Sequence, residues 1–63
     1  MKIEFNTDGA AFGTEDDKAT YGTYYERKEC ARILRKIADQ LDDGGEWGSI
    51  MDINGNKVGR WEM

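Results

Sequence analysis

The sequence contains no histidine and a single cysteine, Cys30, among its 63 residues. Without imidazole the chain can form neither a Ser-His-Asp nor a Cys-His arrangement, and the commonest general base near neutral pH is missing. A lone thiol excludes an internal disulfide and cannot build the usual zinc cage. A chain this short also has little room to desolvate a pair of carboxylates and separate their pKa values. The sequence therefore predicts no enzyme activity, no metal site and no cofactor.

Long apolar runs are also missing, since no stretch approaches the roughly 20 residues that a membrane span requires. The chain opens with the alternating stretch MKIEFN and not with a signal peptide. An unpaired cysteine is typical of a reducing compartment. We therefore expect a cytoplasmic protein, in a bacterium or in an infected cell, that does not bind membranes.

The length predicts a single small domain, residues 1–63. A domain of this size buries only about 60% of the surface that its unfolded chain exposes. Such domains are usually reinforced by disulfides, a metal or oligomerisation. Because the first two are excluded here, we expect a homodimer.

The opening stretch MKIEFN alternates apolar and polar side chains, and this period of two predicts a half-buried strand. Asp8 and Gly9 then form a hairpin signal, because type I′ turns need positive φ. With that loop, Phe5 lies opposite Phe12 in an aromatic cross-strand pair. We therefore expect a hairpin over residues 1–13.

Residues 13–22, GTEDDKATYG, are polar and contain the acidic cluster Glu15, Asp16 and Asp17. This composition predicts an exposed connection with one helical turn capped by Thr14.

A helix is predicted over residues 23–43. Thr23 and Glu26 have the spacing of a capping box, and Gly44-Gly45 is a glycine C-cap signature. Apolar residues recur at spacings of three and four and give the helix one apolar face. They are Cys30, Ile33, Leu34, Ile37 and Leu41. Cys30 needs no role beyond that of a small buried hydrophobe.

A second hairpin is predicted over residues 46–63, around the segment DINGN. Asp52, Asn54 and Asn56 occupy positions 1, 3 and 5, as the first ligands of a calcium loop would. An EF-hand loop also needs glycine at position 6 and glutamate at position 12, and here the glycine, Gly55, is at position 4. An Asn-Gly turn accounts for every residue of the segment, so we expect a turn.

Two registers are possible for this hairpin. A two-residue loop pairs Met51 with Val58, whereas a three-residue loop with a glycine bulge pairs Ile50 with Val58 and Trp47 with Trp61. A slip of one residue exchanges the faces of the strands. We favour the second register for its tryptophan pair. The predicted fold is α+β, a small antiparallel sheet in the order β(β)αββ with one amphipathic helix packed on one face.

The stretches MKIEFNTDGAAF, ARILRKIADQL and GSIMDINGNKVG together resemble small uncharacterised proteins of bacteriophages, prophages and other mobile elements. The resemblance spans most of the chain except the acidic connection, and its motifs are structural. It implies no catalytic residue. Some small acidic phage proteins, anti-CRISPR proteins among them, inhibit host immunity, and the analogy with them is one of size, charge and source.

Charge is segregated along the chain. Residues 1–22 have five acids and two bases, residues 23–38 two acids and five bases, and residues 39–63 six acids and two bases. At the end of the predicted helix the macrodipole is negative, so each carboxylate there costs roughly a few tenths of a kcal/mol. The acids are therefore a hypothetical binding surface for a basic partner, and solubility, with Asp-Gly as a helix stop, is the alternative explanation. The candidate residues are Asp39, Asp42, Asp43 and Glu46, together with Glu15, Asp16 and Asp17.

The middle segment carries a basic stripe on the exposed helix face. Basic residues can bind phosphates, but the pI of about 4.6 is far from that of a typical nucleic-acid binder. We therefore favour a solvated helix surface over a nucleic-acid site. The stripe consists of Arg27, Lys28, Arg32, Arg35 and Lys36.

The chain has more aromatic residues than one helix and a small sheet can cover, and tyrosine and tryptophan are enriched at interfaces. Core packing is the alternative role for them. The candidates are Tyr21, Tyr24, Tyr25, Trp47 and Trp61.

The functional hypothesis is a small acidic accessory protein, encoded by a phage or mobile element, that binds a host macromolecule. In its sharpest form the protein inhibits a basic, nucleic-acid-binding host defence protein. The alternatives are a small nucleic-acid-binding protein that uses the basic stripe and a structural homodimeric module.

Overall fold

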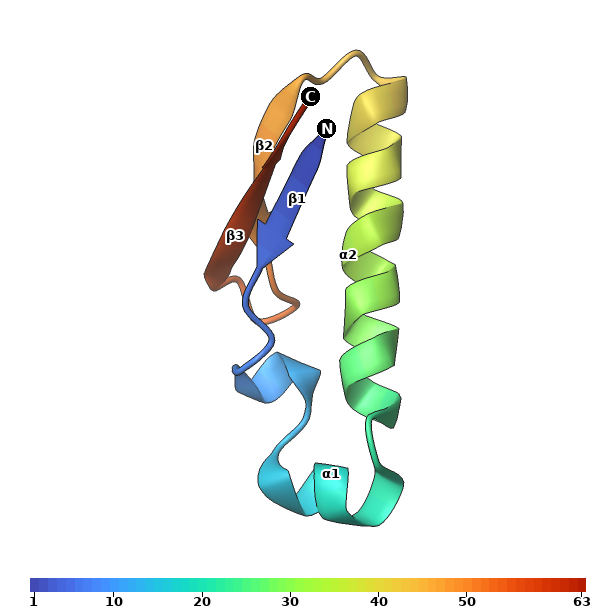
Figure 1. The fold of residues 1–63 in the computed structure, drawn as a ribbon, viewed down its shortest axis with the longest axis vertical. Helices are drawn as coiled ribbons and strands as arrows, with labels where there is room; N and C mark the ends of the chain where they lie inside the picture. Colours follow the sequence, from blue (N-terminus) through green and yellow to red (C-terminus); the bar gives the residue numbers. More distant parts are fainter.

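The computed structural model describes residues 1–63 as one three-stranded antiparallel sheet with a long helix along one face (Figure 1). The molecule measures 40 × 18 × 16 Å, and a second, short helix lies at one end of its long axis. The predicted α+β class is confirmed, although the second helix exceeds the single turn that was expected. In chain order the elements are β1 (Lys2–Phe5), the 3₁₀ helix η1 (Ala10–Phe12), α1 (Glu15–Tyr21), α2 (Tyr24–Asp42), β2 (Trp47–Met51) and β3 (Lys57–Glu62).

The strand order is β1-β3-β2, so the last strand of the chain is the central one. β1 pairs with β3, from Lys2 opposite Glu62 to Phe5 opposite Gly59. The predicted hairpin over residues 1–13 is therefore wrong. Pairing with β3 places β1 where its inward side chains pack against the buried core beneath the sheet.

The segment after β1 turns without a hairpin. Gly9 has a φ of −72°, whereas a type I′ turn would require a positive value, and residues 10–12 form η1. η1 turns Phe12 into the core with 0% of its surface exposed. Phe5 and Phe12 still stack, with ring centroids 6.2 Å apart. The predicted aromatic contact thus forms between a strand and a 3₁₀ helix.

The capping box of this chain opens α1. The Asp17 amide donates to Thr14 Oγ1 at 3.2 Å, and the Thr14 amide donates to Asp17 Oδ2 at 3.0 Å. The box predicted at Thr23 and Glu26 is wrong, because Thr23 Oγ1 accepts instead from the Arg27 guanidinium. α1 leads almost directly into α2, and Thr23, with φ −102° and ψ 20°, lacks the extended backbone that a side-chain cap requires.

The end of α2 is the predicted glycine C-cap. Gly44 has a φ of 91°, its amide donates to the Leu41 carbonyl, and the Gly45 amide donates to the Gln40 carbonyl. These two bonds form a Schellman motif after the C-cap residue Asp43. The motif fixes the direction in which the chain leaves α2 for β2.

The core lies between α2 and the inner face of the sheet. It is small, so the free energy of unfolding should be modest. The Trp61 indole donates to Gln40 Oε1 at 2.8 Å and packs over Gly48, where a Cβ would lie 2.8 Å from the indole nitrogen. Leu34, predicted on the apolar face, is 47% exposed. The buried apolar residues are Phe12, Ile33, Ile37, Ile50 and Trp61.

The C-terminal hairpin combines the two predicted registers. Its loop has three residues, because the Asp52 amide donates to the Asn56 carbonyl. A bulge between Ile50 and Met51 then shifts the pairing, so the body of the hairpin has the register of the two-residue loop. Trp47 consequently pairs with Glu62, and the favoured Trp47–Trp61 pair is wrong.

Candidate functional site

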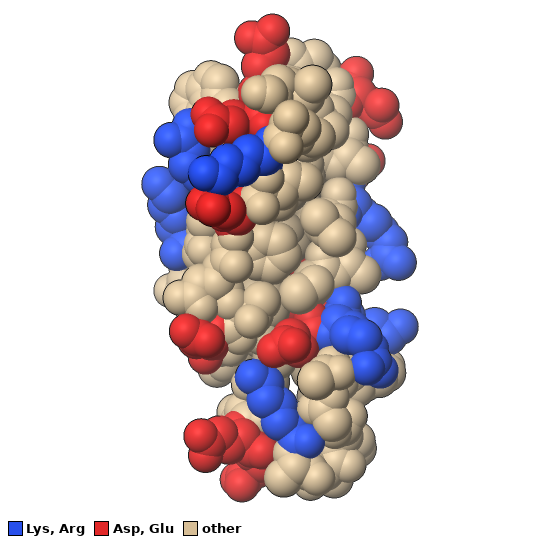
Figure 2. Space-filling view, in the orientation of Figure 1, with Lys and Arg blue, Asp and Glu red and all other residues tan.

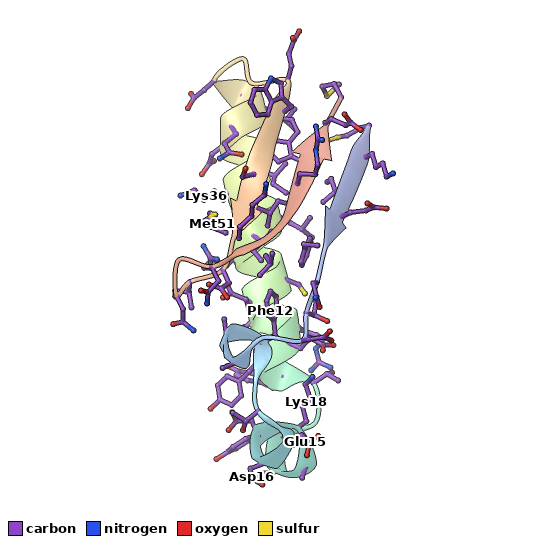
Figure 3. All side chains as sticks on the ribbon, turned by 90° about the vertical axis from the view of Figure 1, so that its left-hand side faces the viewer. Phe12, Glu15, Asp16, Lys18, Lys36 and Met51 are labelled. Atoms are coloured by element: carbon purple, nitrogen blue, oxygen red, sulfur yellow. The ribbon has the colours of Figure 1, made fainter.

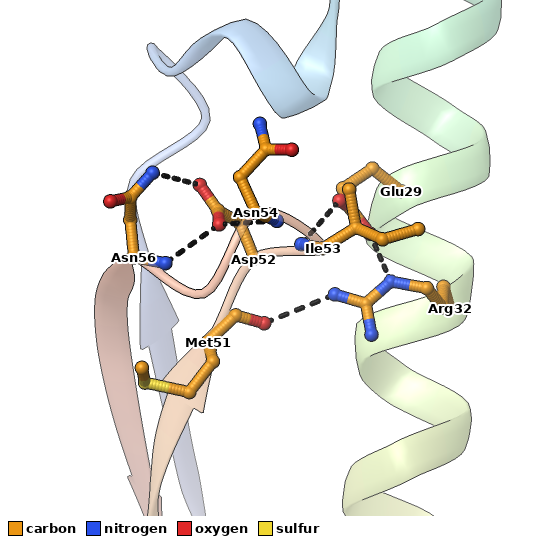
Figure 4. A network of polar contacts seen from close by, with 7 residues as sticks. All are labelled: Glu29, Arg32, Met51, Asp52, Ile53, Asn54 and Asn56. Atoms are coloured by element: carbon orange, nitrogen blue, oxygen red, sulfur yellow. Dashed lines mark hydrogen bonds and ion pairs between the residues drawn. The ribbon is translucent and has the colours of Figure 1, made fainter.

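The turn after β2 is organised by the carboxylate of Asp52, which is 5% exposed (Figure 4). Asp52 Oδ1 accepts from the amides of Asn54 and Asn56, each at 2.9 Å, and Oδ2 accepts from Asn56 Nδ2 at 3.3 Å. Gly55 supplies the left-handed residue with a φ of 84°. DINGN is thus the predicted turn, with both oxygens of its first residue bound by the turn itself. No group of three acidic, cysteine or histidine side chains gathers there to hold a metal ion.

The same hydrogen bonds tune the acidity of Asp52. Those donated by Asn56 and Asn54 hold the pKa of its carboxyl below the ordinary value of 3.8, against the opposing effect of burial. The positive charge of Arg32 lowers this pKa further. Asp52 is therefore ionised near neutral pH, and it is structural.

A second buried carboxylate, Glu29, ties the turn to α2 (Figure 4). Its Oε2 accepts from the Ile53 amide at 3.1 Å, and its Oε1 accepts from Arg32 Nε. Arg32 Nη2 in turn donates to the Met51 carbonyl at 3.0 Å. This Glu29–Arg32 network was missed from the sequence, although Glu29 precedes the core residues Ile33 and Ile37 at spacings of four and eight.

Cys30 is half-buried and packs against the core. Burial raises the pKa of its thiol, and the nearby carboxylates of Glu26 and Glu29 raise it further. The thiol therefore stays protonated near neutral pH, which suits the predicted role of a small hydrophobe and not that of a nucleophile.

A groove of about 310 Å³ lies between α2 and β2. Its apolar side chains come from both elements, and Arg32 and Lys36 border it from α2. Figure 3 labels Lys36 and Met51 on the β2 side of the molecule, and both residues line the groove. The groove is lined by Arg32, Ile33, Lys36, Ile37, Gln40, Ser49, Ile50, Met51, Asp52, Ile53 and Gly55.

The structure separates the two predicted acidic clusters. Glu15 and Asp16 lie in the first turn of α1, at one end of the long axis (Figure 3). The Asp17 carboxylate accepts from the Thr14 amide in the capping box. The other cluster lies at the opposite end, where α2 finishes, and Figure 2 shows acidic side chains at both ends. The seven acids therefore do not form one surface. The residues at the α2 end, Asp39, Asp42, Asp43 and Glu46, are all exposed.

The basic stripe is broken by Arg32, whose guanidinium is held by Glu29 and the Met51 carbonyl at the edge of the sheet. Lys28 lies over the Tyr24 ring at 5.5 Å from its centroid. Arg35 and Lys36 are exposed and lie within ion-pair distance of no carboxylate. The stripe is thus a set of separate cations along α2.

The aromatic candidates divide into three groups. Trp61 is 1% exposed and belongs to the core, so its predicted interface role is wrong. Trp47, on the outer face of β2, is 70% exposed. Tyr21, Tyr24 and Tyr25 pack edge to face around the start of α2 and remain partly exposed. Trp47 is the most exposed aromatic residue of this chain.

No protein-family model, no curated protein and no solved structure matches this chain. Neither helix combines the length and the apolar character that crossing a membrane would require. The class that the fold and the site define is a small α+β protein whose two buried carboxylates, Glu29 and Asp52, are structural and whose other charged residues are at least partly exposed.

Proposed function

We propose that this protein acts by binding a basic surface of a host protein, and that the exposed acidic end of α2 is its recognition surface. The observation that carries the proposal is the state of four carboxylates: Asp39, Asp42, Asp43 and Glu46 are exposed, and none forms an ion pair within the chain. Elsewhere, Glu4, Glu26, Glu29 and Glu62 each have a cation partner, and Asp8, Glu15 and Asp16, which have none, lie outside the α2 end.

The position of these acids is unfavourable for the isolated protein. The last turn of α2 carries the negative end of the helix dipole, and it contains no basic residue. Asp39 and Asp43 are also a like-charge pair at a spacing of four. A cationic partner would relieve this repulsion, and the Schellman motif after Asp43 holds the last turn in one conformation for it.

The sharpest form of the proposal is an inhibitor that occupies the nucleic-acid-binding surface of a host defence protein in the bacterial cytoplasm. The resemblance to small phage and mobile-element proteins and the net charge of −4 support it. A compact acidic end can imitate the phosphate charge that such a surface recognises.

Affinity capture from a bacterial lysate, with and without nuclease, tests the proposal. A basic protein should be retained by the wild type after nuclease treatment, released by added DNA, and lost with Asp42→Lys plus Glu46→Lys. The control Lys28→Glu plus Arg35→Glu, a charge change of equal size and opposite sign, should retain it, because these cations lie outside the acidic end. Capture that survives the first pair, or that vanishes with nuclease, would reject the proposal.

A second candidate is nucleic-acid binding through α2. The supporting observation is that Lys28, Arg35 and Lys36 have no carboxylate partner. Gel shifts with generic DNA and RNA at low salt should then show binding that weakens steeply with salt and is lost in Lys28→Glu plus Arg35→Glu.

A further inference from the structure

β2 is an edge strand that carries no charged residue. Its sequence is WGSIM, and only β3 pairs with it. The other edge strand, β1, carries Lys2 and Glu4 on its solvent side. Edge strands of soluble proteins are usually protected by charges, proline or a covering element. β2 has neither charge nor proline. One side chain from outside the sheet, Arg32, bonds to its free edge at the Met51 carbonyl, so the rest of this edge is open to a further strand.

The groups that β2 presents at its free edge follow from its bonds to β3. The Met63 amide donates to the Glu46 carbonyl, and the Asp52 amide donates to the Asn56 carbonyl. The backbone amides and carbonyls of the even-numbered residues of this segment therefore point toward β3. Along a strand the direction alternates. Trp47, Ser49 and Met51 therefore direct their amides and carbonyls outward, and the bond from Arg32 to the Met51 carbonyl agrees with this direction.

We propose that two copies of the chain pair antiparallel through β2, with the twofold axis at Ser49. The two sheets then join in the order β1-β3-β2-β2-β3-β1, and both α2 helices lie on the same face. On the outer face, Trp47 of each copy lies opposite Met51 of the other. These side chains are 70% and 45% exposed in the single chain, and a thioether against an indole is a favourable contact. The edge is thus complementary to itself, as a twofold interface requires.

The heights of α2 and β2 determine which helix residues meet across this axis. Two contacts set the levels. Gly48 lies level with Gln40, since a Cβ on Gly48 would lie 3.4 Å from Gln40 Oε1, and Ile53 lies level with Glu29, to which its amide donates. A strand rises about 3.3 Å per residue and a helix about 1.5 Å. Ser49 is therefore level with about residue 38 of α2, midway between Lys36 and Asp39.

The twofold axis consequently places opposite charges together. Lys36 of one copy lies level with Asp39 of the other, and Arg32 lies level with Asp43. All four residues border one shallow hollow on the flank of α2, together with Arg35 and Gln40. The twofold axis repeats each of these two pairings, Lys36 with Asp39 and Arg32 with Asp43, on its other side. Along this flank two cations, Arg32 and Lys36, are followed by two acids, Asp39 and Asp43. In the proposed dimer the cations of one copy lie beside the acids of the other, so the two flanks are complementary in charge.

The pairing also covers the groove between α2 and β2. That groove opens beside the free edge, and Lys36 and Met51 both line it. The second copy supplies a strand next to β2 and a helix next to α2 on the groove side, and its Trp47 covers the half-exposed Met51 side chain on the outer face. A chain with only five buried apolar residues gains core by this association.

The oligomeric state of the purified full-length chain tests the proposal. Sedimentation at rising micromolar concentration and low salt should show a species of twice the 7.2 kDa chain mass. Ser49→Glu should be monomeric, because two carboxylates then meet at the axis, while the fold survives since Ser49 lies opposite Arg60 on β3. The matched control Ser49→Thr should remain dimeric. A wild type that stays at 7.2 kDa, or a dimeric Ser49→Glu variant, would overturn the proposal.

Charge exchange tests the register independently of folding. Lys36→Glu and Asp39→Lys should each weaken the homodimer, because each brings like charges together across the axis. An equimolar mixture of the two variants should restore a heterodimer, because both acidic positions of the first variant then meet lysines of the second. A mixture no more associated than the separate variants would show that these residues do not meet.

The interface and the proposed function can fail separately. Asp39 and Asp43 belong to both surfaces. Asp42 does not line the hollow and Glu46 lies beyond the helix, so these two residues take no part in the twofold pairing. Sedimentation uses the chain alone, and capture from a lysate depends on Asp42 and Glu46. Loss of one property with the other intact identifies the proposal that is wrong.

Discussion

Two buried carboxylates, Glu29 and Asp52, hold the C-terminal turn in place, and they differ in how visible they are in the sequence. Asp52 could be predicted as a turn residue because its partners, Asn54 and Asn56, are within four positions along the chain. Glu29 bonds to Ile53, 24 positions away. Local spacing shows that Glu29 falls on the apolar face, but nothing local shows which amide it accepts from.

Asp52→Asn should lower the melting temperature at neutral pH, because the neutral amide is a weaker acceptor for the Asn54 and Asn56 amides. The pKa of Asp52 is lower in the folded chain than the ordinary 3.8. Its contribution is therefore fully present above that value and is lost as the pH falls through the lower folded pKa.

The acid side of the stability curve measures this contribution. Thermal unfolding monitored by circular dichroism should show a shallower acid decline for Asp52→Asn than for the wild type. Asp8→Asn, which removes an exposed carboxylate outside the turn, is the control and should keep the wild-type slope. If the melting temperatures of all three proteins fell equally steeply with acid, the Asp52 carboxylate would not stabilise the fold through its lowered pKa.

Glu29→Ala should lower the free energy of unfolding by about 1–3 kcal/mol, because it leaves the Ile53 amide without its acceptor. Glu29→Gln keeps an acceptor oxygen and most of the volume, so it should lose less. Urea unfolding of the two variants measures the difference. If Gln and Ala cost the same, the hydrogen bond to Ile53 does not contribute.

At the scale of elements, α2 and the C-terminal hairpin could be predicted, α1 was expected only as a single turn, and the pairing of β1 could not be predicted. α2 has a periodic apolar face and a glycine cap, which are both local signals. β1 has two possible partners, the nearby residues 10–13 and the distant β3, and its alternating pattern suits both equally. The choice depends on the shape of the core, because η1 is needed to bury Phe12. The bulge between Ile50 and Met51 likewise has no local signature.

Gly59 fixes the spacing between β1 and β3, and its substitution tests that pairing. A Cβ at position 59 would overlap the Glu4 carbonyl oxygen and lie 2.6 Å from the Phe5 Cα. Both are backbone atoms, so β1 itself must move. Gly59→Ala should therefore destabilise the fold by about 1–3 kcal/mol.

Hydrogen exchange locates this effect. Amides of Lys2–Phe5 should lose protection in Gly59→Ala more than those of α2. Gly9→Ala is the matched control, because its Cβ would meet only Asp52 Oδ2 at an ordinary 3.7 Å and its φ is negative. Unchanged protection of β1 would show that the two strands can separate without cost.

At the scale of the whole molecule, the charge segregation along the sequence becomes a segregation along a 40 Å axis. The sequence predicted which acids and bases were candidates, but it could not show that Glu15 and Asp16 lie at one end and Asp42 at the other. It also could not show that Arg32 closes a buried network. These facts depend on the path of the chain through α1 and on the level of α2 against β2, which are properties of the assembled fold.

The α1 end of the axis should open independently of the body. α1 has seven residues, none of them buried, and it contacts α2 through the Lys18–Glu26 ion pair and the Tyr21–Tyr25 rings. So short a helix is marginal in isolation, and loss of its cap costs about 1 kcal/mol. Thr14→Ala should therefore unravel α1, with fast amide exchange over residues 15–21 and early tryptic cleavage at Lys18. The melting temperature of the body should stay close to that of the wild type and of the control Thr20→Ala. A fall as large as that of the core variant Ile37→Ala would mean that α1 folds as one cooperative unit with the sheet, and that the two ends of the molecule are not independent.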